Sequence, residues 1–194
     1  MPAKTPEEAV DAFLERFRSA LGCVVRATIL GSGYAPGRKH SVTAFGQGLG
    51  GMRPMRLHTH GGVGELGLRI LRFYAVGRDA NDAGAGYSVF DSFHHHDILD
   101  RDGREIVVFH WEPEGRGPVR EPHLHMPAAE PVVLPQRGGS PLAGAKTHLG
   151  NLHLPTGEIG IEAVVELLIR DFAVDPLRAD WSDVLAASRA RRGA

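Results

Sequence analysis

Residues 87–111 read YSVFDSFHHHDILDRDGREIVVFHW, and this stretch decides the fold class. Two runs, 87–99 and 105–111, flank the tetrapeptide DRDG at 100–103. An Asp-Gly pair between two apolar runs is a strong short-range signal for a β-hairpin. The second run is almost wholly apolar, which is typical of a central strand. The stretch therefore predicts the antiparallel centre of a sheet.

The segments on either side of this hairpin predict helices at both ends of the chain. Thr5 and Glu8 form a capping-box pattern around Pro6, and apolar residues then recur at helical spacing until Gly22. Further strands are predicted at 23–30, 40–45 and 66–76, a long proline-rich connection at 113–155, and helices from Thr156 and from Asp180. We predict one α+β domain over residues 1–194, with a mostly antiparallel sheet of about five strands, one N-terminal helix and two C-terminal helices.

Composition narrows the classes of function. The formal net charge is −1, which gives no global attraction to nucleic acid or to an anionic membrane. The chain has a single cysteine, Cys23, so an intramolecular disulfide is excluded, and this fits a reducing compartment. The chain shows neither a signal-peptide core nor an apolar run of membrane-spanning length. We expect a cytoplasmic protein with no membrane association.

Histidines are the strongest functional signal. The chain has 11, and eight of them lie between His94 and His153. In extended chain, residues i and i+2 share a face. His94 and His96 are therefore expected on one face with His95 opposite, and His123 and His125 share a face if that segment is extended. A loop of only Asp102-Gly103 would place His95 across from His110, whereas a four-residue loop would place His94 across from Phe109; both registers stay open.

The first hypothesis is metal-independent acid–base catalysis, for example RNA cleavage. One histidine would accept the 2′-hydroxyl proton and a second would protonate the leaving oxygen, while a cation stabilises the phosphorane charge. The predicted catalytic residues are His94, His96, His123, His125 and Lys146, with Arg72 or Arg120 as alternative cations.

The second hypothesis is that the histidines bind a transition-metal ion. One stretch of the sequence resembles the first metal motif of the cupin family. It consists of Gly117, then five residues, then His123-Leu124-His125, then four residues and Glu130. The resemblance implies a small β-barrel whose ion is bound by His123, His125 and Glu130. A second motif would use His148 and Asn151. A third hypothesis is a non-catalytic module that binds a partner, and no feature of the sequence excludes it.

Residues 87–126 resemble the TumE-family toxins of bacterial toxin–antitoxin pairs. The resemblance rests on Tyr87-Ser88, on 100–104 (DRDGR) with the apolar strand that follows, on Trp111-Glu112-Pro113 and on 122–125 (PHLH). The family usually carries an Asp-Asn-Ala-Pro-like phrase where this chain has 111–114 (WEPE), and this chain is longer. The resemblance implies a cytoplasmic toxin that acts on RNA and is restrained by a helix-turn-helix antitoxin. The oligomeric state stays open.

Overall fold

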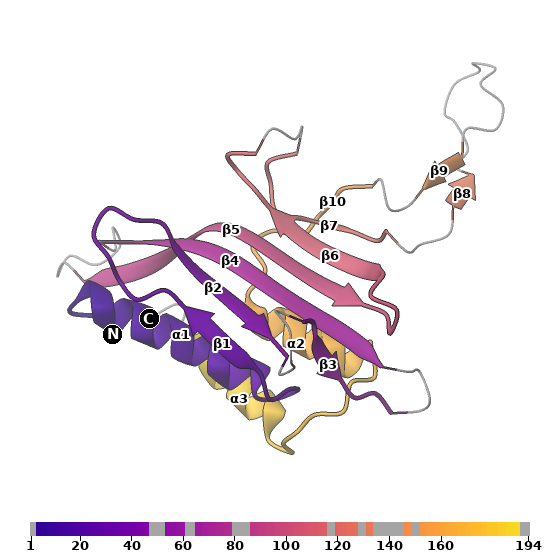
Figure 1. The fold of residues 1–194 in the computed structure, drawn as a ribbon, viewed down its shortest axis with the longest axis horizontal. Helices are drawn as coiled ribbons and strands as arrows, with labels where there is room; N and C mark the ends of the chain where they lie inside the picture. The colour runs from indigo at the N-terminus through magenta and orange to yellow at the C-terminus, as the bar shows by residue number, and fades with distance from the viewer. Residues whose placement is uncertain are drawn as a thin grey trace.

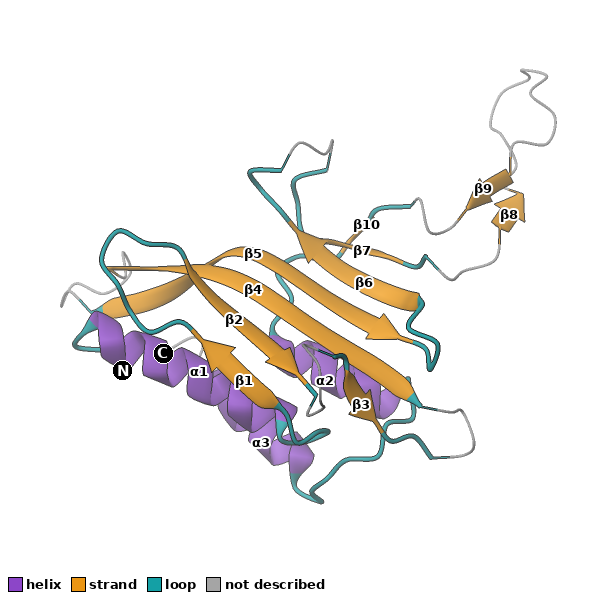
Figure 2. Ribbon diagram, viewed as in Figure 1, coloured by secondary structure: helices purple, strands orange, loops and turns teal. Residues whose placement is uncertain are grey.

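Three helices lie together on one face of an antiparallel sheet (Figures 1 and 2). The computed structural model describes residues 3–46, 53–60, 65–78, 86–115, 119–127, 131–133, 146–148 and 152–190. The helices are α1 (Pro6–Leu21), α2 (Ile161–Arg170) and α3 (Trp181–Ala190). The strands are β1 (Thr28–Gly31), β2 (His40–Phe45), β3 (Met55–Leu57), β4 (Leu66–Arg78), β5 (Tyr87–Leu99), β6 (Glu105–Trp111), β7 (His123–His125), β8 (Pro131–Val133), β9 (Lys146–His148) and β10 (Leu154–Pro155). The predicted α+β class, with one N-terminal and two C-terminal helices, is confirmed.

The main sheet has more strands than the sequence predicts. Its order is β1-β2-β4-β5-β6-β7-β10, and β3 pairs with β4 as an eighth strand, whereas about five were predicted. The pairings are all antiparallel. The additional strands β3, β7 and β10 are too short to produce a periodic pattern. The sheet is open, with β1 and β10 at its edges (Figure 1), whereas the cupin resemblance implies a barrel.

The β5–β6 hairpin has the first of the two predicted registers, although its loop is longer than two residues. His95 lies opposite His110, as a two-residue loop would require. The ladder shifts by one residue between Ile98 and Leu99, and Leu99 then pairs with Glu105. This irregularity compensates for the longer turn, so the central register is the same. Val107 and Val108 fall on opposite faces of the sheet, because neighbours along a strand alternate between its faces.

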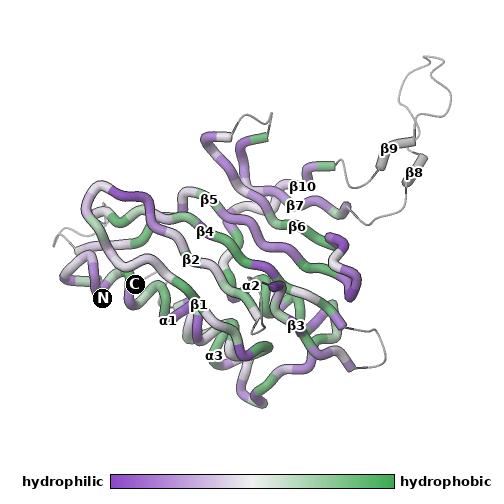
Figure 3. The backbone as a smooth tube through the Cα atoms, in the orientation of Figure 1, coloured by the Kyte–Doolittle hydropathy of each residue, from purple (hydrophilic) through white to green (hydrophobic). Residues whose placement is uncertain are grey.

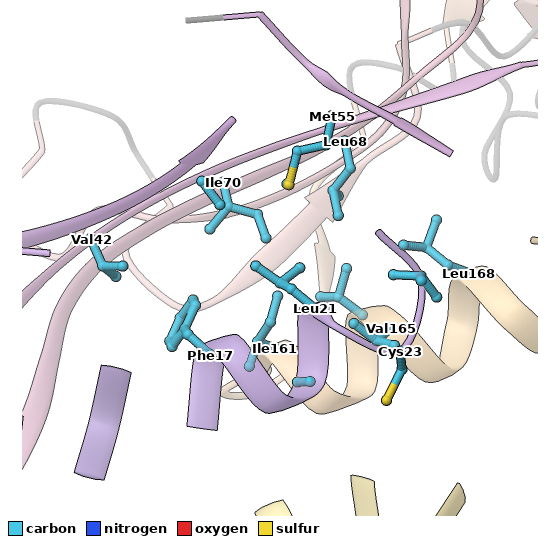
Figure 4. Packing of buried hydrophobic residues seen from close by; sticks show 14 of the residues in the cluster. Phe17, Leu21, Cys23, Val42, Met55, Leu68, Ile70, Ile161, Val165 and Leu168 are labelled. Carbon is cyan, nitrogen blue, oxygen red and sulfur yellow. The ribbon is translucent and has the colours of Figure 1, made fainter. Parts of the chain in front are cut away.

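The core lies between the sheet and the helices. The Thr5 side chain accepts a hydrogen bond from the Glu8 amide and caps α1, as predicted. Figure 4 shows Phe17 and Leu21 of α1, Val42, Met55, Leu68 and Ile70 of the strands, and Ile161, Val165 and Leu168 of α2 in one cluster. This packing covers one face of β4 and β5. None of the helices that the structure describes has the length and apolar character that crossing a membrane requires.

A buried carboxylate joins the three helices. Glu162 of α2 is 1% exposed and accepts hydrogen bonds from Arg16 of α1 at 3.0 Å and from the Ser188 hydroxyl of α3 at 2.6 Å. Burial opposes ionisation, but the hydrogen bond from Ser188 and the charge of Arg16 outweigh it and lower the pKa of Glu162. The carboxylate thus stays ionised and orients the helices around one point.

Several predicted boundaries are wrong. Cys23 and Val24 are buried but belong to the turn after α1, and the strand begins only at Thr28. Helix α2 begins after Gly160 rather than at Thr156, because Gly157 has a positive φ of 66° that a helix does not accept. The stretch 113–155 is not only a connection, because β7, β8, β9 and β10 lie within it.

Candidate functional site

Histidines from four segments meet on the face of the sheet opposite the helices. His95, His110 and His123 lie directly opposite one another on β5, β6 and β7. Their ring centroids are 5.3 Å apart at each step along this row. In Figure 3 the hydrophilic histidine segment of β5 runs beside hydrophobic residues of β4. Because strand neighbours alternate between faces, this row points away from the hydrophobic core.

His125 and His153 complete a cluster around His123. His125 follows His123 by two residues and shares its face, as predicted, with the two ring centroids 4.8 Å apart. His153 comes from the residue before β10, and its ring centroid lies 4.8 Å from that of His123 and 4.4 Å from that of His125. We call His110, His123, His125 and His153 the histidine cluster.

Three side chains of the histidine cluster present nitrogen atoms to one point. One ring nitrogen each of His110, His123 and His125 lie within 4.8 Å of one another. The Nε2 atoms of His123 and His125 are 3.0 Å apart. Tetrahedral coordination with Zn–N bonds of about 2.1 Å separates ligand nitrogens by about 3.4 Å, so these positions suit a single ion.

A backbone carbonyl fixes the tautomer of His123. Its Nδ1 lies 2.7 Å from the carbonyl oxygen of Glu121, which can only accept a hydrogen bond. Nδ1 therefore carries the proton, and in the neutral ring Nε2 keeps the lone pair that points at His125. Metal-bound histidines are oriented in this way by a carbonyl or carboxylate on the second nitrogen.

The electrostatic environment shifts the pKa values of His95 and His110 in opposite directions. The hydrogen bond with Asp97 at 2.8 Å raises the pKa of His95. Asp97 is in turn held by Arg69, whose Nε donates to it at 2.6 Å. Burial and the neighbouring charge of His95 lower the pKa of His110. A neutral His110 is the form that a metal ion requires.

The structure does not bring His94 and His96 to this cluster. Both side chains are fully buried on the helix-covered face, stacked with centroids 5.3 Å apart. Neither nitrogen of either ring has a hydrogen-bond partner among the described residues. Burial lowers the pKa of His94 to about 3 and lowers that of His96 strongly. The hypothesis that one of them works beside His123 or His125 therefore needs correction, since the sheet lies between them, and the β5 histidine on the same face is His95.

The other predicted residues contribute less to the site. Arg72 is buried beneath the helices, where it pairs with Asp91 at 2.8 Å, so it is on the wrong face to serve as the cation. The Arg120 carbonyl accepts a hydrogen bond from the Trp111 indole. The backbone of Lys146 belongs to β9, while its side chain lies outside the described part of the chain. Glu130 and Asn151 also lie outside the described residues.

Sequence reasoning did not assign His110 or His153 to a site. His110 could have been found, because one of the two open hairpin registers already placed it beside His95. His153 joins through the pairing of β10 with β7, which brings residues 154–155 to 123–124. Two-residue strands leave no periodic signal, so this contact had no local sign in the sequence.

Comparisons with known proteins do not assign the chain to a family. The chain matches no protein-family model, and neither a curated protein nor a solved structure shows significant similarity to it.

Proposed function

We propose that the protein is a metalloprotein that holds a transition-metal ion through His110, His123 and His125. The observation that carries this proposal is the convergence of three imidazole nitrogens within 4.8 Å. Imidazole ligands suit zinc, copper, nickel and iron, and three of them leave coordination positions for water or substrate. A bound ion of this kind would supply Lewis acidity to a hydrolytic reaction.

The surroundings of the three histidines favour ion binding over simple packing. The Glu121 carbonyl presets the tautomer of His123, and the pKa of His110 is lowered by burial and by the charge of His95. His123 is 2% exposed, while His110 and His125 are only half-buried, so the centre lies against the sheet and opens outward. The exposed ring of His153 lies beside this opening, with its centroid 4.4 Å from that of His125.

Calorimetric titration of the metal-free full chain with Zn²⁺ tests the proposal. We expect one ion per chain, and we expect His123→Ala and His125→Ala to abolish that binding. His58→Ala is the matched control, because His58 is exposed and lies outside the histidine cluster. Equal binding by the wild type and both site variants would rule out the centre.

A second candidate, a toxin-like ribonuclease that needs no metal, is favoured by the chain of contacts Arg69–Asp97–His95. This chain holds His95 beside His110, and a carboxylate-oriented histidine next to a second one suits proton transfer at a phosphate. The TumE resemblance and a helix-turn-helix antitoxin partner stay predictions of this candidate. It requires RNA cleavage that persists in chelator and is lost in His95→Ala and His110→Ala.

A further inference from the structure

Aromatic side chains continue the open face of the sheet beyond the histidines. Phe73 of β4 lies opposite Phe93 of β5, and their ring centroids are 5.2 Å apart. The Phe93 ring lies 6.0 Å from the ring of His110 and 6.4 Å from that of His95. Both phenylalanines are only partly buried. The two rings thus extend the face on which the histidine cluster lies.

A third ring, Phe90, lies further along this face. Phe90 is 46% exposed and pairs with the exposed Ala75 of β4. The neighbouring pair, Val76 and Val89, packs against the core, so Phe90 and Ala75 point the opposite way. A Cβ placed on Gly77 would meet the Phe90 ring at 3.3 Å, which shows that the ring lies over that glycine. We call Phe73, Phe90 and Phe93 the aromatic strip.

We propose that the aromatic strip binds a single strand of nucleic acid, with bases stacked on Phe90 and Phe93 and a phosphate at the metal centre. The inference rests on the proposed centre, because a divalent ion held by neutral imidazoles is the positive charge that attracts the phosphate. Every base has a π-face, so exposed phenyl rings accept any sequence. In a duplex the bases are stacked inside, so the strip selects single strands.

Charge alone does not recruit such a strand. The whole chain has a net charge of −1, and Arg69 on this face is already paired with Asp97 and Glu105. Long-range attraction is therefore weak, and the stacking rings have to provide a large part of the affinity. This predicts a modest dependence of binding on salt and a strong dependence on the aromatic side chains.

Fluorescence anisotropy with a labelled oligonucleotide of about 12 nucleotides tests the inference. The probes are an RNA and a DNA of one sequence, each single-stranded and as a duplex, with the metal-loaded full chain. We expect Phe90→Leu and Phe93→Leu each to weaken single-strand binding by about ten-fold, since leucine keeps the apolar volume but removes the ring face. Leu177→Ala is the matched control, because Leu177 is also exposed but precedes α3. Binding of either single strand supports the inference, and the RNA-to-DNA ratio shows whether the 2′-hydroxyl is read.

Repeating the titration in chelator separates this inference from the proposed centre. A protein that binds zinc, yet whose single-strand affinity is the same in both leucine variants, overturns the aromatic strip alone. A protein that binds no ion but loses strand affinity in the leucine variants overturns the metal centre and the phosphate position together. Duplex binding as tight as single-strand binding, or a dimer in sedimentation that Phe90→Leu dissociates, would also overturn the proposed occupant.

Discussion

Adjacent histidines on β5 have different environments because a strand alternates its side chains between two faces. His94 and His96 enter the core, while His95 between them reaches Asp97 on the open face. Of these three consecutive histidines, two therefore pack in the core and one lies on the open face. The sequence predicts this alternation, but only the positions of the helices show which face is covered.

The burial of His94 and His96 predicts an acid-labile fold. The ordinary pKa of 6.5 applies to the unfolded chain, whereas the folded pKa of His94 is about 3. Between these values the unfolded state binds more protons, so stability is fully present above pH 6.5 and falls as the pH decreases toward 3. Each such group contributes a slope of about 1 kcal/mol per pH unit to the free energy of unfolding.

Urea denaturation at several pH values, in chelator, measures this slope. We expect His96→Leu to show a shallower pH dependence than the wild type, with unchanged or higher stability at neutral pH, because leucine leaves no ring nitrogen without a partner. His58→Leu is the exposed control. Parallel pH profiles for wild type and His96→Leu would contradict this account, because they would mean that folding does not lower the pKa of His96.

At the scale of elements, the turn between β5 and β6 positions the histidine row. Gly103 has a φ of 83°, and no atom lies within 4 Å of the position that a Cβ would occupy. We expect Gly103→Ala to lower the free energy of unfolding by about 1 kcal/mol, because only backbone strain opposes it. The Asp100 side chain still accepts from the amides of Asp102 and Arg104, so the register and zinc stoichiometry stay unchanged.

Thermal denaturation compares this variant with Gly33→Ala. No atom lies within 4 Å of a Cβ at Gly33, and its φ is not positive, so that change costs little. Equal melting temperatures for the two variants would show that the turn relaxes to accept alanine.

The helices depend on a single buried carboxylate. Glu162→Ala removes the acceptor shared by Arg16 and Ser188, and we expect it to lower the free energy of unfolding by about 3 kcal/mol. Glu166→Ala is the matched control on the same helix, since its ion pairs with Arg170 and Arg189 are more exposed and are worth less than about 1 kcal/mol. Chemical denaturation of both variants checks the difference. Equal losses would mean that Glu162 does not join the helices.

At the scale of the whole molecule, local sequence patterns predicted the helices and strands better than the contacts between them. The bounds of β2, β5 and β6 agree with the sequence, because each has a clear apolar or alternating run between turn residues. The strands that complete the site, β7 and β10, contain three and two residues and depend on partners far along the chain. The histidine cluster was therefore only partly predictable. The sequence singled out His123 and His125, one of the two open registers placed His110 beside His95, and His153 required the fold.

The sheet separates a structural face from a face available for chemistry. Arg72, His94 and His96 lie beneath the helices with the apolar core, and the histidine cluster and aromatic strip lie on the other side. The proposed metal and strand binding would therefore depend on other residues of these strands than those that pack against the helices. We expect substitutions on the helix-covered face, in a protein that still folds, to leave metal binding by the histidine cluster unchanged.

Elemental analysis of tag-free protein, purified without chelator, tests the central claim most directly. Three proteins are compared: the wild type, His110→Ala and His96→Leu, with folding of each checked by circular dichroism. The metal centre predicts close to one transition-metal ion per chain in the wild type and in His96→Leu, and almost none in His110→Ala. An ion content that is the same in His110→Ala as in the wild type, or that is lost only in His96→Leu, would contradict it.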